Sequence, residues 1–167
     1  MTISLAIMAR IRGALSQSGD GGTAQLPVNV SQELALADGT AADQANAVYI
    51  DAFSIAASGS LNLDLAGGGL TDRLGNALNF TAVKAILLIA DATNTNNIVV
   101  GNGTNPFVGP FGAGTHSLAV EPGGQILLAT RTAAGWAVVA GTGDVLKLAN
   151  SGAGSAVTGT IVIVGEA

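Results

Sequence analysis

Short apolar segments separated by turn-forming residues run along most of this chain, and they limit the folds open to it. We count about ten such segments, spaced about ten residues apart, with no convincing long helix. Five follow residue 114, namely Thr115–Val120, Gln125–Thr130, Trp136–Ala140, Val145–Leu148 and Ala156–Val164. Many short strands with glycine-rich turns are typical of an antiparallel β-sandwich or jelly roll. At 167 residues, the chain fits one such domain, 1–167.

The central stretch predicts the middle of a sheet. Thr81–Ala90 is almost wholly apolar, the Asx- and Thr-rich segment Asp91–Asn97 forms turns, and Ile98–Val100 starts a β-branched run. Two apolar runs around such a turn predict a β-hairpin. A helix over Ala82–Ala90 is the alternative, because alanine and leucine favour helix. In a strand, one alternating pair faces the main core, either Ile86 and Leu88 or Leu87 and Ile89.

The N-terminal segment has strict alternation. In a strand, every second residue lies on the same face, and here that face would carry the apolar residues Ile3, Leu5, Ile7, Ala9 and Ile11. Residues 1–18 therefore predict a strand or arm, and a terminus with this pattern is suited to contacts with other subunits or a shell. Arg10 and Arg12 lie on the opposite face, where they can meet an acidic partner. Positive charges follow the apolar residues, which is the wrong order for a secretory signal, and no transmembrane segment is expected.

A second candidate interface is the loop Gly101–Gly114, which is rich in glycine and proline around Phe107, Val108 and Phe111. A loop of this length usually has a function or a partner. We expect these three side chains to contact another subunit or a shell. The alternative is that this loop and the N-terminal segment pack onto their own domain.

The chain has few charges, which predicts a homo-oligomer. Charged residues make up 10% of the sequence and apolar residues 49%, whereas about 25% charged residues is usual in a soluble domain. A monomer with a neutral Ala/Gly/Thr/Asn surface is the alternative. The net charge is −5 and the six basic residues are scattered. We therefore expect no nucleic-acid binding and no attachment to a membrane through a basic patch.

No catalytic motif stands out, and we predict no enzyme activity and no cofactor. The absence of cysteine excludes thiolate chemistry and cysteine-ligated zinc. His116 is the only histidine and has no partner at a triad spacing, and the glycine clusters lack the Gly-Lys of a phosphate-binding loop. Asp91–Asn97 offers oxygen ligands for calcium but lacks the glycine and terminal glutamate of an EF-hand loop. We therefore predict no metal site.

The chain resembles a family of small structural proteins encoded by tailed bacteriophages and prophages. The resemblance is carried by Asp38–Tyr49, Leu63–Gly67, Leu74-Gly75 with Phe80–Lys84, Glu121–Gly124, Gly143–Gly152 and Ile161–Gly165. It implies a virion component that assembles through β-rich oligomers and carries no enzymatic site. With the low charge, it favours a capsid decoration or cement protein on the capsid surface, made in the bacterial cytoplasm.

The partners expected on this basis are copies of the chain, as a cyclic trimer, and the major capsid protein or other virion proteins. One alternative is a tail, tip or head-fibre subunit involved in host attachment. Another is an enzyme such as a glycan hydrolase, which would need two carboxylates about 5 to 10 Å apart.

Overall fold

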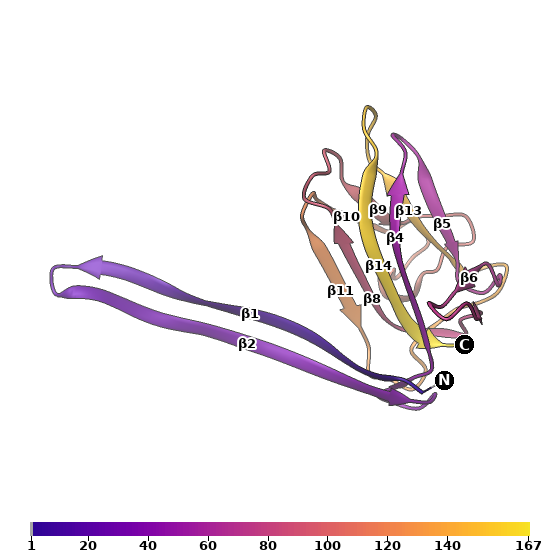
Figure 1. Cartoon of the computed structure of the whole chain (residues 1–167), viewed down its shortest axis with the longest axis horizontal. Helices are drawn as coiled ribbons and strands as arrows, with labels where there is room; N and C mark the ends of the chain where they lie inside the picture. The colour runs from indigo at the N-terminus through magenta and orange to yellow at the C-terminus, as the bar shows by residue number, and fades with distance from the viewer. Residues whose placement is uncertain (1) are drawn as a thin grey trace.

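The computed structural model describes residues 2–167 and has two parts, a β-sandwich body and a long two-stranded arm (Figure 1). The arm is formed by β1 (Ser4–Gly19) and β2 (Gly22–Asp38). It leaves the lower end of the body and extends well beyond it. The expected N-terminal strand is confirmed, but it is only half of a hairpin that reaches residue 38.

One layer of the body, here called the β8 sheet, has the strand order β11-β8-β14-β4. The short strand β12 also pairs with β8, on the same side as β11 but nearer the start of β8. These strands are β4 (Ala47–Ile55), β8 (Ala82–Ala90), β11 (Gln125–Ala129), β12 (Trp136–Ala137) and β14 (Val157–Glu166). All neighbouring strands are antiparallel. β8 and β14 lie in the middle of the sheet and carry its longest apolar runs.

The second layer, the β9 sheet, has the order β10-β9-β13-β5. Its strands are β5 (Ser60–Asp64), β9 (Ile98–Gly101), β10 (Ser117–Val120) and β13 (Val145–Asn150), and they also pair antiparallel. Smaller elements are β3 (Gln44–Ala45), the hairpin of β6 (Leu70–Thr71) with β7 (Ala77–Leu78), and the short 3-10 helix η1 (Gly109–Phe111). The all-β antiparallel sandwich is confirmed, and the jelly-roll arrangement is not.

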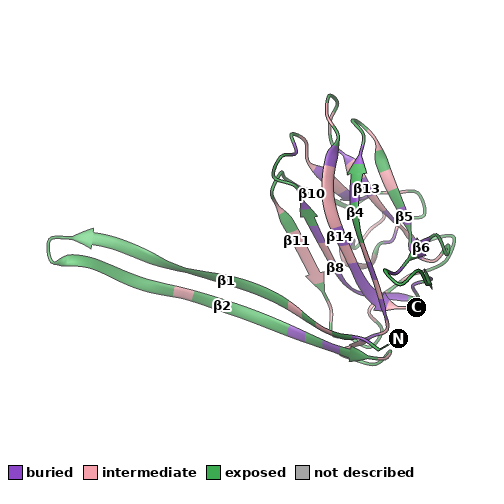
Figure 2. Ribbon diagram, viewed as in Figure 1, coloured by how far each residue is buried: buried purple, intermediate pink, exposed green. Residues whose placement is uncertain are grey.

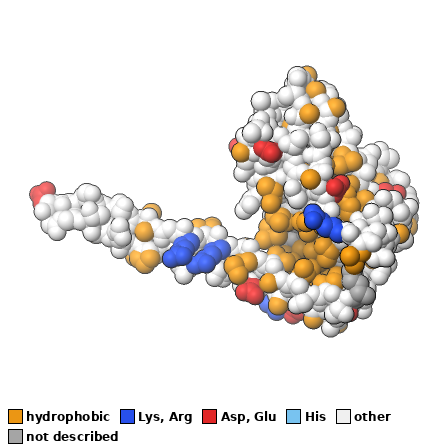
Figure 3. Space-filling view, in the orientation of Figure 1, with side chains coloured by type: hydrophobic (Ala, Val, Ile, Leu, Met, Phe, Trp, Pro, Cys, Tyr) orange, Lys and Arg blue, Asp and Glu red, His pale blue; other side chains and the backbone are white. Residues whose placement is uncertain are grey.

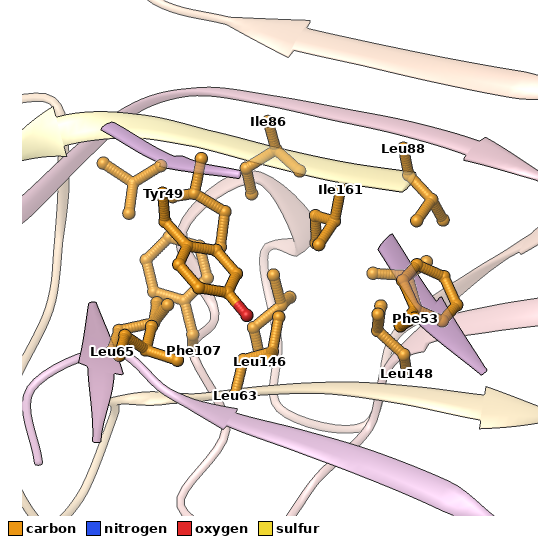
Figure 4. Close-up of a cluster of buried hydrophobic side chains, with 14 of the residues drawn as sticks. Tyr49, Phe53, Leu63, Leu65, Ile86, Leu88, Phe107, Leu146, Leu148 and Ile161 are labelled. Carbon is orange, nitrogen blue, oxygen red and sulfur yellow. The ribbon is translucent and has the colours of Figure 1, made fainter. Parts of the chain in front are cut away.

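The two sheets enclose one main core. Ile86, Leu88 and Ile161 point inward from the β8 sheet and meet Leu146 and Leu148 of the β9 sheet (Figure 4). Of the two alternating pairs on β8, the pair that faces the main core is therefore Ile86 and Leu88. Leu87 and Ile89 point to the other face of the sheet.

The predicted hairpin of the central stretch is wrong, although both of its strands are confirmed. β8 and β9 belong to different sheets and do not pair. The connecting turn instead crosses from one layer to the other. Its Asn94 is nearly buried and bonds the backbone of Thr158 on β14 in both directions, each bond 2.8 Å long. Asn94 thus takes the place of a strand residue at that end of β14.

The glycine- and proline-rich loop 101–114 packs onto its own domain. The expectation that Phe107 and Phe111 contact another subunit or a shell is therefore corrected. Phe107 is 1% exposed and Phe111 9% exposed, and both lie in the main core. The Phe107 amide donates to the Val145 carbonyl over 2.9 Å, so the loop finds its backbone partner on β13. Because water is excluded from both rings, neither is available to another subunit. Val108 remains exposed.

We predict that the two faces of β8 differ in their contribution to stability. Leu88→Ala removes a fully buried side chain and lowers the free energy of unfolding by about 2 to 5 kcal/mol. Leu87→Ala, the matched change one residue away on the half-exposed face, lowers it by only about 1 kcal/mol. Urea denaturation of both variants, compared with the unchanged chain, measures the difference. Equal losses would show that the strand faces are assigned incorrectly.

Candidate interaction surface

The arm is an amphipathic hairpin. Its strands pair without interruption from Ser4↔Ala37 to Gly19↔Gly22, closed by the two-residue turn Asp20-Gly21. One face, here called the apolar arm face, carries pairs of side chains along its whole length, and these are Leu5/Leu36, Ile7/Leu34, Ala9/Gln32, Ile11/Val30, Gly13/Val28 and Leu15/Leu26. The other face carries Arg10, Arg12, Glu33 and Met8, and its remaining residues are small or polar. This follows from the period of two along both strands.

The base of the apolar arm face packs on the outside of the β8 sheet. Leu34 and Leu36 are buried against Ala85 and Val164, with Leu5 and other partly buried side chains around them. These contacts form a second small core outside the sandwich. They show that the apolar arm face and the outer face of the β8 sheet are complementary surfaces.

Hydrogen bonds and an ion pair fix the root of the arm. β2 pairs with β3 in parallel at Ala37↔Gln44, and Ala37 donates to the Asp43 carbonyl over 3.0 Å. The Asp43 carboxylate accepts two bonds from Arg131, 2.8 Å and 3.0 Å long. The hydrogen bond from Arg131 lowers the pKa of Asp43, so this contact is present at neutral pH and is lost as the pH falls through that lowered value.

A buried lysine positions the loop that carries Arg131. Lys84 is 1% exposed and forms an ion pair of 2.8 Å with Glu166. Its ammonium also donates to the carbonyls of Thr132, over 2.7 Å, and Ala133. Since three acceptors surround the charge, its burial is compensated. The loop next to Arg131 is thereby held against β8, close to the root of the arm.

Beyond its base the arm has no cover. Figure 2 shows the arm exposed over almost its whole length, with buried residues confined to the end near the body. Exposed fractions are 70% for Ile11, 64% for Leu15 and Leu26, and 66% for Val30. A two-stranded hairpin in water is marginally stable at best. The apolar face of the outer arm is therefore not stabilised by contacts with the described residues of the body.

The outer face of the β8 sheet is also apolar. Register places its side chains in rows across the four strands, and the first two rows are Ala129/Ala85/Val164/Val48 and Leu127/Leu87/Val162/Ile50. The arm base covers part of the first row. In the third row Ile89 is 40% exposed between Gln125 and Thr160. No charged residue lies in these three rows.

A groove of about 620 Å³ separates the two apolar surfaces. One wall is the arm from Leu5 to Ile11, and the other is formed by Ala85, Leu87, Leu127 and further residues of the β8 sheet. In Figure 3, hydrophobic side chains gather on the body beside the point where the arm leaves it. The arm diverges from the sheet, so it cannot cover this face with its own outer half.

The residues expected from sequence to form an interface are not all brought together. Ile3 is buried at the root, where its amide donates to Asp38 over 3.2 Å. Leu5 and Ile7 lie half-buried on the arm base. Arg10 and Arg12 are exposed on the polar face of the arm. Val108 lies on the η1 loop of the body, apart from the groove-lining residues.

Sequence reasoning missed half of this surface. It missed the distal residues of β2, Leu26, Val28 and Val30, and the outer residues of the β8 sheet, Leu87, Ile89, Leu127 and Val162. The signal was present, because Thr81–Ala90 is apolar on both alternating faces. One of those faces fills the main core, and the other forms the outer apolar face of the β8 sheet.

Polar groups singled out in the sequence are held by nearby protein groups. The His116 ring bonds the Phe111 carbonyl over 2.8 Å. The Asp91 carboxylate accepts bonds from the amide and hydroxyl of Thr93, which lower its pKa. Among residues 2–167, no three histidine, aspartate or glutamate side chains are grouped so that they could hold a metal ion. In the same residues no helix is long and apolar enough to cross a membrane.

Comparisons of the chain with protein-family models, with curated proteins and with solved structures found no match.

We predict that the only tyrosine reports on the closed sandwich. Burial, the nearby Asp51 charge and a 3.1 Å hydrogen bond to Asp51 raise the pKa of Tyr49 to about 12. The unfolded value is about 10, so this group contributes stability below about pH 10 that is lost as the pH rises toward 12. Absorbance titration at the tyrosinate band should show a late transition in folded protein and one near pH 10 in denaturant. A folded protein that titrates near pH 10 would contradict the packing.

We also predict that the buried ion pair is strongly coupled. Glu166→Gln leaves the Lys84 charge without its counter-ion and lowers the free energy of unfolding by about 3 kcal/mol. Lys84→Met combined with Glu166→Gln should recover part of that loss, because no buried charge remains. Denaturation of Glu166→Gln, Lys84→Met and the double variant gives the coupling free energy between the two side chains. Additive losses would show that Lys84 and Glu166 act independently.

Proposed function

We propose that the chain is a non-enzymatic structural subunit of a tailed-bacteriophage particle, namely a capsid decoration or cement protein. In this role it forms a homo-oligomer, a cyclic trimer, and binds the major capsid protein or another virion protein on the capsid surface. The observation that carries the proposal is the amphipathic arm, which projects from a rigid sandwich with its apolar face uncovered. An exposed apolar arm of this kind suits a subunit whose arm is covered by neighbouring subunits in an assembly.

The character of the exposed surface supports this role. Exposed apolar residues on a free monomer are normally scattered, and a large contiguous patch marks an interaction site. Here the patch extends from the β8 sheet along the arm. The resemblance to small structural proteins of tailed bacteriophages is the reason for proposing that this assembly is a virion.

The end of the body away from the arm supports a second candidate, a tail, tip or head-fibre subunit for host attachment. That end carries two polar loops, 91–97 and 151–155, joined by hydrogen bonds from Asn96 to the carbonyls of Ala153 and Ser155. Loops on a rigid scaffold are common binding elements. An arm at one end and polar loops at the other suit a subunit that is anchored at one side and binds at the other.

Quantitative mass spectrometry of purified particles, produced from a phage genome that encodes this sequence, tests the proposal. A decoration protein should be present in hundreds of copies per particle, because it follows the symmetry of the shell. About a dozen copies or fewer would favour the tip or fibre subunit instead. The absence of the chain from particles that contain all other virion proteins would contradict both.

A further inference from the structure

The apolar arm face is continuous, but the body covers only its base. From Ile11 to the turn the face is free, and at about 3.4 Å per residue this stretch is about 30 Å long. With two strands about 5 Å apart, and side chains on each, the free face measures roughly 300 Å². Its side chains are already ordered by the hairpin register, so covering them needs no further folding of this segment.

The outer face of the β8 sheet offers a matching surface. Leu87, Val162 and Leu127 form a row of apolar side chains beside the groove, and Ile89 continues it. Within the same chain, Leu34 and Leu36 of the arm already pack on the adjoining row at Ala85 and Val164. Side chains at the base of this hairpin face therefore already pack on the outer face of the sheet.

Charge narrows the kind of partner. Neither the apolar arm face nor the three rows of the β8 sheet carries an ionisable side chain. Arg10, which also lines the groove, lies with Arg12 and Glu33 on the opposite arm face. A nucleic acid or an acidic peptide would need basic groups facing it. An uncharged apolar surface of similar size is the better match, and this chain presents two such surfaces.

We infer that the occupant is a second copy of the chain, and that the distal arm of one copy covers the outer face of the β8 sheet of another. One arm covered in this way buries roughly 600 Å² in total, counting both partners, so two copies that exchange arms bury about 1,200 Å² across their shared interface. Specific protein interfaces begin at about that size. An exchange in both directions between two copies reaches this size, and in a closed ring, where each copy also gives one arm and receives one, each of its two interfaces contains about 600 Å² of arm contact.

This inference deepens the proposed function by assigning the surface through which copies associate. The inference is tested on purified protein of residues 1–167, in the absence of phage particles. If copies associate as described but particles lack the chain, then the interface stands and the virion role fails. If particles contain the chain but the isolated copies do not associate through these surfaces, then the interface is wrong and the virion role stands.

The first test compares charge substitutions by sedimentation equilibrium. Leu15→Asp, on the apolar arm face, should reduce the association constant at least 100-fold, whereas Ser16→Asp on the opposite face of the same strand should leave it within about threefold. Ile89→Asp should act like Leu15→Asp. Its control is Leu118→Asp on β10, because Leu118 is 39% exposed and Ile89 is 40% exposed. Circular dichroism of each variant shows whether the body is folded.

The second test uses cross-linking, which the absence of native cysteine makes specific. Leu15→Cys and Ile89→Cys are made as separate variants, so a bond between them can form only between two copies. A mixture treated with a short bis-maleimide should give a covalent dimer containing both variants. Leu15→Cys mixed with Leu118→Cys should not. Either of two results would overturn the inference, namely a monomer at every concentration, or an oligomer that keeps its affinity with Leu15→Asp and Ile89→Asp and gives no mixed cross-link.

Discussion

The packing of Leu34 and Leu36 on Ala85 and Val164 is the contact on which the architecture depends. It attaches the hairpin to the outside of the β8 sheet by its base alone. The rest of the arm is therefore directed away from the body, with its apolar side uncovered. The same contact leaves the remaining rows of the sheet open beside the arm. One small cluster thus explains both the shape of the molecule and its exposed apolar surfaces.

The direction of the arm is supported by polar contacts that reach into the body. Lys84 on β8 binds Glu166 and two carbonyls of the loop between β11 and β12. That loop presents Arg131, which binds Asp43 just after the arm. The Lys84–Glu166 pair is buried and the Arg131–Asp43 pair is exposed. Ion pairs of either kind add little net stability by comparison with apolar contacts, but they restrict the geometry of the groups they join. Here they connect the sandwich to the root of the arm through a series of short contacts.

Sequence patterns predicted the strands of this fold well where the apolar period is local. Alternation over residues 3–11 identified the first arm strand, and the run at 82–90 identified β8. What a local pattern does not encode is which strand pairs with which. The local pattern after β8 therefore predicts a hairpin turn, although Asn94 binds β14 and the chain continues to the other sheet. Phe107 was similarly assigned to an interface, because its place in the core depends on the distant strand β13.

Amide hydrogen exchange of the distal arm, measured as a function of protein concentration, tests the central claim most directly. An uncovered two-stranded hairpin opens readily, whereas a hairpin held on a neighbouring sheet does not. Our account predicts fast exchange over residues 11–30 in dilute protein and slow exchange at concentrations where copies associate, with the strands of the body protected throughout. Exchange in the distal arm that does not change with concentration, while the protein does associate, would contradict it.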